Sequence, residues 1–373
     1  MDNYNPVNLI TYLRQSICQR LAQSARRAFP LKSLFTFFLC SFVTVLTIES
    51  TFAATTTDSG SRHDSVDQHY PDHAITLVSP YGKGGAADIA ARVLASVAPQ
   101  YIGQPALVEN RLGAGGIAGS NSVYTDQGQG YELLLARFGT MNGGAAVRSD
   151  IPYDFKRFTM LGLLEVNPWV CVTSSKSQIY SIKDLMTQVK QNPKEISYSM
   201  TGFGDLHHLI PMFLLDRMGI EDPTQVKPKF YPSGKKNFNA GATGEVTFVC
   251  GNLSAANPFI RNKTVRPLLI NTPQRHSQLP NVPTVAELGH PELEDIAAWS
   301  GVFAAPNMPE QAKTKWAKAL QEVKVDPAWN KLVTAVGSIP SVLTPEQTRE
   351  FILNQYQEIT ELVNRLDLKK TSN

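Results

Sequence analysis

The 373-residue chain has few of the features that several common protein classes require. It has only four cysteines, and its charges nearly balance, with 35 basic and 32 acidic residues. Cys18 and Cys40 fall in an N-terminal segment that we predict to be removed, which leaves Cys171 and Cys250. Two cysteines are too few for a disulfide framework or for a cysteine-based zinc site. We therefore predict no metal site.

Complete nucleotide-binding motifs are also missing. Gly82 and Gly84 begin a G-x-G pattern, but Ala87 stands where the third glycine of a dinucleotide fingerprint belongs. The Gly-Lys-Ser/Thr of a phosphate-binding P-loop does not follow the turn. We predict no cofactor.

The most apolar stretch near the N-terminus is short. Leu34–Ile48 has no charge but only 15 residues, whereas a membrane-spanning helix needs about 20. Five basic residues precede it, and the small residues of "STFAA" follow it. This succession predicts a signal peptide over residues 1–53, cleaved before Ala54, and a periplasmic protein. An uncleaved anchor is the alternative. "ARRAFPLK" resembles a twin-arginine signal, but Pro30 interrupts it, so we favour the general secretory route.

Removing this segment takes away five basic and two acidic residues and leaves 30 of each. The mature chain then has no basic footprint for nucleic acid or a membrane surface. Residues 54–73 are polar and rich in Thr, Ser, Asp and His, and we predict that they form a disordered N-terminus.

Beyond residue 74, strand and helix patterns alternate, which predicts an α/β protein with parallel strands. The strand patterns lie at residues 74–80, 105–110, 131–137, 169–175, 195–200, 227–231, 245–251 and 266–271. The helical patterns lie at Asp88–Ala98, Gly116–Tyr124, Ile182–Gln191, His207–Met218 and Pro309–Val323. We expect the fourth of these helices to be amphipathic, with Leu206, Ile210, Phe213 and Leu214 on its apolar face.

Two glycine-rich loops stand between a predicted strand and a predicted helix. The first glycine loop contains Gly82, Gly84 and Gly85, and the second contains Gly202 and Gly204. In open α/β sheets the ligand crevice lies at the carboxyl ends of the strands. Free amides at a helix N-terminus suit an anion. The two loops together predict a site for a small anion, most simply a carboxylate, although a tight turn that binds nothing would have the same pattern.

The chain resembles the Bug-type, TctC-like extracytoplasmic receptors of tripartite tricarboxylate transporters. The resemblance rests on "PYGKGGAADIAARVLA", "VENRLGAGGIAG", "YSMTGFGDLHHL", "LPNVPTVAELG" and "WSGVFAAPNMPE", and it covers about residues 74–366. It implies the two-lobed type II periplasmic binding protein fold with a hinged cleft. We predict one lobe from residues 74–170 and 268–373, and the other from residues 171–267. It also implies capture of a carboxylated metabolite by the two glycine loops.

Matching the family position by position gives the candidate ligand-binding residues. They are Tyr81, Lys83, Gly84, Gly85, Ala86, Asp88, Thr201, Gly202, Phe203, Gly204, Asp205 and Tyr231. Lys83 and Asp205 depart from the family pattern, as does Ala87, so the identity of the ligand is open. If both charges face the cleft, the ligand would carry an amino group as well as a carboxylate.

Several of these residues also have purely structural interpretations. Asp88 would stabilise its helix through the helix dipole, and Asp205 would be an N-cap. His208 would brace its loop, and Lys83 would point into solvent. We expect Asn110 and Arg111 to hold the first lobe together and Trp299 to lie in the core. Whether Cys171 and Cys250 form a disulfide is open, although an exported protein permits it.

The predicted function is that of a monomeric solute receptor that delivers its ligand to the permease subunits of a tripartite tricarboxylate transporter. A receptor that feeds a sensor kinase would have the same sequence features. An exported enzyme is the third possibility, with Asp205, His207 and His208 as acid/base groups. Successive helical residues point in different directions, however, and no serine elbow or zinc motif accompanies them. We predict no catalytic residue.

Overall fold

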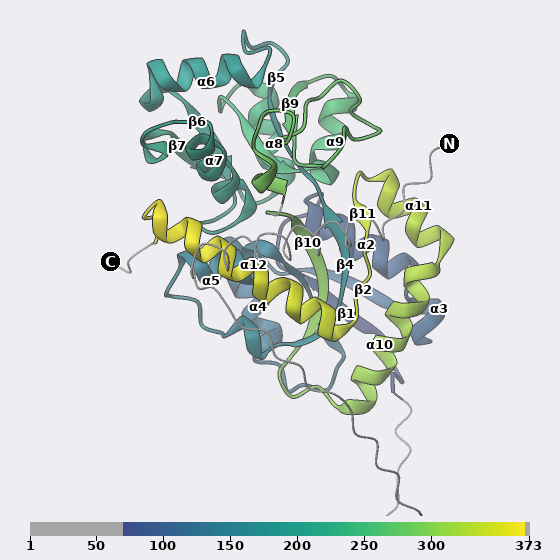
Figure 1. Ribbon diagram of the computed structural model, residues 1–373. Helices are drawn as coiled ribbons and strands as arrows, with labels where there is room; N and C mark the ends of the chain where they lie inside the picture. The colour runs from purple at the N-terminus through teal and green to yellow at the C-terminus, as the bar shows by residue number, and fades with distance from the viewer. Residues whose placement is uncertain (1–69, 295, 370–373) are drawn as a thin grey trace, which may run out of the picture. The chain divides into compact units, whose positions relative to one another are not determined.

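The computed structural model describes residues 70–294 and 296–369, and over these ranges it shows a mixed α/β protein (Figure 1). The predicted signal peptide and most of the predicted disordered segment lie outside the described residues. The end of that segment is ordered, because the Tyr70 hydroxyl donates to the Gly130 carbonyl at 2.6 Å and accepts from the Trp316 indole at 2.9 Å. Tyr70, which lies inside the segment predicted to be disordered, is therefore held against the fold. In the described part of the chain, no helix combines the length and the apolar character needed to cross a membrane.

The largest sheet has six strands in the order β11-β4-β10-β3-β1-β2. Their bounds are β1 Ile75–Ser79, β2 Ala106–Asn110, β3 Glu132–Arg137, β4 Thr159–Asn167, β10 Ala298–Ala304 and β11 Ile339–Pro340. β1 pairs in parallel with β2 and β3, but β10 is antiparallel to both β3 and β4. The prediction of parallel strands was therefore only partly right. β10 and β11 lie far along the chain and return to this sheet in the opposite direction.

Side chains that alternate along β3 build two apolar layers, one on each face of this sheet. Leu133 and Leu135 share an apolar cluster with α2 (Ala86–Val97), α10 (Glu310–Val325) and α11 (Pro327–Ala335). Leu134 and Ala136 belong to the cluster that contains α5 (Asn142–Val147) and α12 (Pro345–Arg365), the long yellow helix of Figure 1. Helices on both faces explain why β3 reads as a continuous apolar run.

The segment between β4 and β10 forms two smaller sheets. One is antiparallel, in the order β8-β5-β9, and the other is the parallel pair β6-β7. The bounds are β5 Trp169–Ser174, β6 Ser197–Met200, β7 Lys227–Phe230, β8 Val249–Asn252 and β9 Val265–Ile270. The helices of this segment are α6 Ile182–Gln191, α7 Leu206–Arg217, α8 Gly234–Thr243 and α9 Leu253–Arg261. Two short helices, α3 (Pro99–Ile102) and α4 (Ile117–Tyr124), precede β3 in the sequence.

The chain passes from the large sheet to the smaller ones between the end of β4 at Asn167 and the start of β5 at Trp169. It returns between β9 and β10. The exact lobe boundaries given above stay a prediction. Trp299 in β10 is fully buried, as expected, and its indole donates to Gln355 at 2.9 Å.

Helix α7 differs from the amphipathic helix that we predicted. Every residue from Leu206 to Leu215 is buried, including His207, His208 and Pro211. A helix that is enclosed on all sides by its own domain needs no polar face. The buried surface of α7 is therefore wider than the apolar face that we predicted from the sequence.

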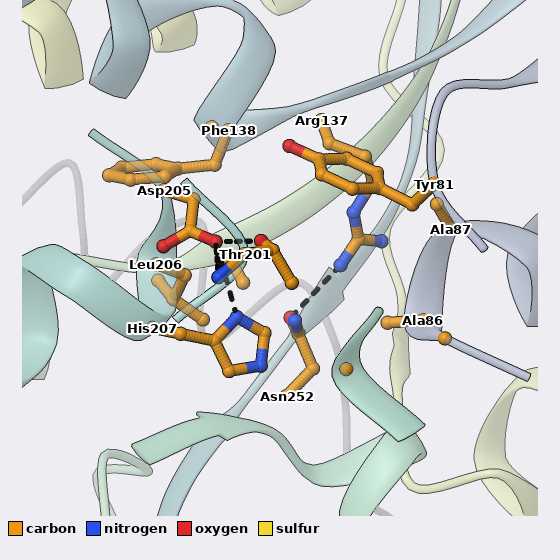
Figure 2. Close-up of a pocket in the computed structure, with 14 residues that line it drawn as sticks. Tyr81, Ala86, Ala87, Arg137, Phe138, Thr201, Asp205, Leu206, His207 and Asn252 are labelled. Carbon is orange, nitrogen blue, oxygen red and sulfur yellow. Dashed lines mark hydrogen bonds and ion pairs between the residues drawn. The ribbon is translucent and has the colours of Figure 1, made fainter. Parts of the chain in front are cut away.

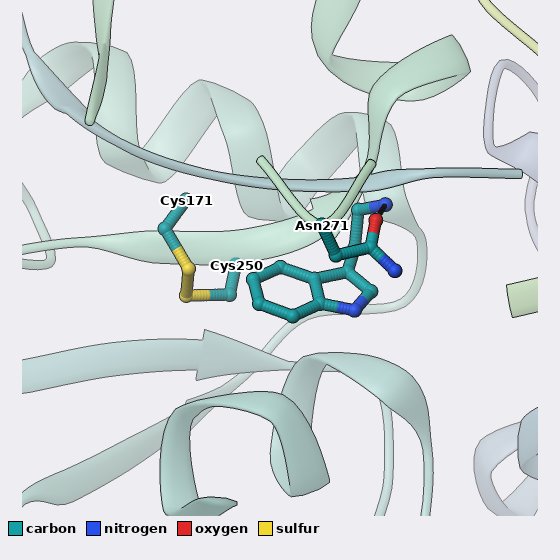
Figure 3. Close-up of a disulfide and its surroundings, with 4 residues drawn as sticks. Cys171, Cys250 and Asn271 are labelled. Atoms are coloured by element: carbon teal, nitrogen blue, oxygen red, sulfur yellow. Dashed lines mark hydrogen bonds between the residues drawn. A yellow bond between two sulfur atoms is a disulfide. The ribbon is translucent and has the colours of Figure 1, made fainter. Parts of the chain in front are cut away.

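Cys171 and Cys250 form a disulfide, which answers the question that the sequence left open (Figure 3). They are directly opposite each other on β5 and β8, with Cα atoms 4.0 Å apart, and both are fully buried. The bridge links residues 79 positions apart in sequence. It fastens β8, which ends at Asn252, to the central strand of the small antiparallel sheet.

Candidate functional site

A pocket lies where the segments that follow β1 and β3 meet the N-terminal ends of α7, α8 and α9 (Figure 2). Its cavity volume is about 40 Å³, which suits a small polar group such as a carboxylate. It is lined by Tyr81, Gly85, Ala86, Ala87, Arg137, Phe138, Gly139, Thr201, Asp205, Leu206, His207, Gly234, Asn252 and Ala298.

Helix N-termini from several segments converge on this pocket. Gly85, Ala86 and Ala87 are the N-cap and first residues of α2, and no side chain of the described residues caps this helix. Gly234 begins α8, and Asn252 is the N-cap of α9. Each helix start presents backbone N–H groups and a partial positive charge. The pocket is therefore suited to an anion, and α2 leaves its first amides free of side-chain partners.

Arg137, the last residue of β3, brings a positive charge to the pocket and is 5% exposed. One guanidinium nitrogen donates to the Asn252 side chain at 2.9 Å, and the other donates to the Ser300 hydroxyl. An arginine has five N–H donors, so these two bonds leave donors for a ligand. Figure 2 shows the guanidinium reaching toward Asn252 across the pocket.

Glu165 on β4 holds Arg137 from the side of the sheet. Its carboxylate lies 3.6 Å from the guanidinium and accepts from the Ser300 hydroxyl at 2.7 Å. Burial lowers the pKa of Arg137, while the negative charge of Glu165 acts in the opposite direction. The ordinary pKa of an arginine is so high that Arg137 stays charged. The cation is thus fixed in one orientation and partly balanced before any ligand binds.

Asp205 is the N-cap of α7, as its structural interpretation predicted. Its carboxylate accepts from the amide of His208 at 2.8 Å and from the amide of Thr201 at 2.9 Å, and it also accepts from the Thr201 hydroxyl. These bonds occupy most of the lone pairs of the carboxylate. Asp205 therefore lines the pocket mainly as the group that ties the second glycine loop to its helix.

The two adjacent histidines of α7 have different surroundings. His208 accepts from the Gly204 amide at 3.2 Å, and burial lowers the pKa of His208 to about 4. It is therefore neutral near pH 7 and braces the loop, as its structural interpretation predicted. His207 lines the pocket instead, with Nδ1 3.6 Å from an Asp205 oxygen.

Tyr81 closes another side of the pocket (Figure 2). Burial raises the pKa of Tyr81, and the negative charge of Asp205 raises it further. The phenol is therefore neutral, and it can act as a hydrogen-bond donor.

The pocket brings together five of the predicted binding residues and leaves out seven. Those that line it are Tyr81, Gly85, Ala86, Thr201 and Asp205, and those that do not are Lys83, Gly84, Asp88, Gly202, Phe203, Gly204 and Tyr231. Lys83 is exposed, so the two unusual charges do not meet in this pocket.

Asp88 serves the structure of its own loop. It accepts from the Gly84 amide at 2.9 Å, from Arg92 at 2.9 Å and from the Asn110 side chain at 3.0 Å. The Gly84 amide is thus used internally rather than offered to a ligand. Asn110 and Arg111 hold this region together as expected, and Arg111 bonds Glu132 at 2.6 Å.

The glycines of the second loop permit close backbone contacts. A Cβ on Gly202 would lie 3.0 Å from the Gly115 Cα, and one on Gly204 would lie 2.7 Å from the Gly143 carbonyl oxygen. Gly204 also has a φ of +81°, which favours glycine. Gly85 has a φ of −81°, so its backbone conformation does not require glycine. The second loop is therefore built to touch the segments beyond β2 and β3.

This contact predicts the effect of Gly204→Ala. Gly219 is a matched control, because its φ is +76° and a Cβ there would meet nothing within 4 Å. Both alanines should cost about 1 kcal/mol of unfolding free energy from backbone strain, and Gly204→Ala should cost more, because its methyl group also meets backbone atoms of α5. Only Gly204→Ala should also weaken ligand binding, because its methyl group pushes the loop away from α5. Equal binding by the two variants, measured by calorimetry, would contradict this account.

Sequence reasoning missed the central residue of the pocket. Arg137 ends the apolar strand pattern "ELLLAR". A charged residue at the carboxyl end of a buried strand lies at the edge where α/β proteins place ligands, and that signal could have found it. No similar sequence pattern pointed to Asn252, Phe138 or Ala298 as pocket residues.

Fold and pocket together define a two-lobed periplasmic binding protein, and comparisons with known proteins agree. A family model described as "Tripartite tricarboxylate transporter family receptor" (TctC) matches residues 90–368. BugT of Bordetella pertussis is 30% identical over 305 residues, which cover 80% of this chain and 91% of BugT. The chain belongs to the TctC receptor family.

Solved structures show the same likeness. The periplasmic binding protein BugD superposes with a TM-score of 0.75 at 26% identity, covering 81% of this chain and all of BugD. MatC from Rhodopseudomonas palustris, solved with bound malate, has a TM-score of 0.70 at 25% identity, with 80% of this chain and 99% of MatC covered. The matched family is described as a receptor family.

Proposed function

We propose that this protein is an extracytoplasmic receptor that captures a small carboxylated metabolite in the pocket around Arg137. The observation that carries the proposal is the pairing of a buried guanidinium with the N-terminus of α2, which no side chain caps. Both features stabilise a negative charge, and both act more strongly where water is excluded. The malate in MatC supports the same ligand class.

Mass spectrometry of what co-purifies is the direct test. The protein is purified without refolding and denatured, and the released small molecules are identified. We expect a compound with at least one carboxylate, which should rebind to the emptied protein with one-to-one stoichiometry. Recovery of a neutral sugar or a cationic compound that rebinds tightly would contradict the proposal.

The receptor would act in the periplasm and pass its ligand to the membrane subunits of a tripartite transporter. The family description supports this role. Immobilised receptor loaded with ligand should retain those subunits from solubilised membranes. Retention of a sensor kinase instead would favour the alternative partner.

Processing gives a further prediction. The order of basic, apolar and small residues in the first 53 positions leads us to expect a mature N-terminus at or near Ala54. N-terminal sequencing of protein released from the periplasm measures it. Recovery of the chain in the membrane fraction with Leu34–Ile48 still attached would show an anchor instead.

A further inference from the structure

His207 has a buried ring nitrogen that no described residue satisfies. The side chain lines the pocket and the residue is 5% exposed, yet Nε2 has no hydrogen-bond partner among the described residues. A Cβ on Gly234, which also lines the pocket, would lie 3.6 Å from this atom. Buried polar atoms are nearly always paired, so an unpaired one at the wall of a binding pocket points to a ligand.

The other ring nitrogen faces a carboxylate. Nδ1 lies 3.6 Å from Asp205 (Figure 2). The ring packs edge-on against Phe238, with centroids 6.3 Å apart. This arrangement orients the ring, so that Nδ1 faces Asp205, while Nε2 lies beside Gly234 and Gly251 without a hydrogen-bond partner among the described residues. Histidine ordinarily changes its charge near neutral pH.

The charges around His207 favour a proton once an anion is bound. Arg137 is partly balanced by Glu165 at 3.6 Å, and Asp205 adds another negative charge beside the imidazole. A bound carboxylate brings one more, whereas a protonated His207 would offset it. Other titratable groups on the surrounding elements include Tyr81 and Tyr198, which burial keeps neutral, and His208, which is neutral near pH 7. Charged groups there include Asp88, which is paired with Arg92 on α2, Asp216 and Arg217 at the end of α7, Arg261 of α9 and the exposed Lys235 and Lys236 of α8.

We propose that His207 contacts the bound carboxylate through Nε2 and takes up a proton when the ligand binds. The proposal rests on the proposed function, because it assigns a second ligand contact in the same pocket. One proton moves from solvent to His207, and Nε2–H then donates to the ligand oxygen. Arg137 and His207 would together hold the anion from two sides, and the affinity would depend on pH.

Calorimetry measures this proton directly. Malate, succinate and glutamate are titrated into the unmodified protein at pH 7.5, and the tightest of them is studied in buffers that differ in ionisation enthalpy. We expect net uptake approaching one proton per ligand. We also expect the affinity to rise by up to tenfold per pH unit as the pH falls from 8 toward 6. Binding without proton uptake and without pH dependence would overturn the proposal.

Two variants assign the proton to a residue. His207→Gln keeps a polar side chain but cannot be protonated, so binding should weaken at low pH and lose both its pH dependence and its proton uptake. His290→Gln is the matched control, because His290 lies outside the pocket, and it should behave as the parent does. Unchanged proton uptake in a folded His207→Gln protein would overturn the assignment. If none of the three carboxylates binds, the titrations are made with the carboxylate that co-purifies. A co-purified ligand without a carboxylate defeats the proposed function and this inference together, whereas carboxylate binding without proton uptake defeats only this inference.

Discussion

Replacement of Arg137 by methionine should abolish most carboxylate binding. Methionine fills similar space but removes the charge and the donors that the pocket offers to an anion. A hydrogen bond to a charged group contributes about 1.5–3 kcal/mol, so the loss of even one should weaken binding by more than about tenfold. Calorimetry with the co-purified ligand measures the change. Parent-like affinity would show that the anion is held elsewhere.

The same substitution should also destabilise the fold, and a second variant separates the two effects. Arg137→Met leaves Glu165 buried, at 2% exposure, without its cation, and an unpaired buried charge is costly. Adding Glu165→Gln should recover much of that stability, because the amide is neutral. Binding should stay weak in the double variant. If binding recovers along with stability, the loss in the single variant was due to misfolding.

Removal of the Cys171–Cys250 bridge should have the largest effect on stability. The bond joins residues that are 79 positions apart in the sequence. A disulfide that closes such a long loop typically adds about 2–4 kcal/mol to the free energy of unfolding, mainly by restricting the unfolded chain. The double variant Cys171→Ala/Cys250→Ala should unfold at a clearly lower temperature and denaturant concentration. Its affinity for ligand should change little, because neither cysteine lines the pocket.

Reducing agent supplies the control for the bridge. Both sulfurs are fully buried, so dithiothreitol should not reduce the folded protein, but it should reduce the denatured one. The parent protein, once reduced in denaturant, should then refold to the stability of the alanine variant. Equal unfolding curves for oxidised and reduced protein would show that the bridge adds no stability.

Local patterns in the sequence determined much of the secondary structure. The apolar runs at residues 131–137 and 169–175 became β3 and β5, and the helix predicted at Ile182–Gln191 is α6 with the same bounds. Asp205 was recognised as an N-cap, because the residue types that cap helices act within one turn. The family motifs likewise gave the fold and the class of protein. All of these depend on residues close together in the chain.

Other features were decided only by the tertiary structure. β4 and β10 escaped prediction, and their antiparallel pairing with each other joins residues 159–167 to residues 298–304. Partners for Arg137 come from β4, β8 and β10, and the opposition of Cys171 and Cys250 depends on the register of β5 and β8. His207 Nε2 has no hydrogen-bond partner among the described residues, and its burial results from the packing of α7 against the rest of the fold. Local propensity cannot specify such contacts, because their energy comes from burial and pairing between segments that the sequence holds far apart.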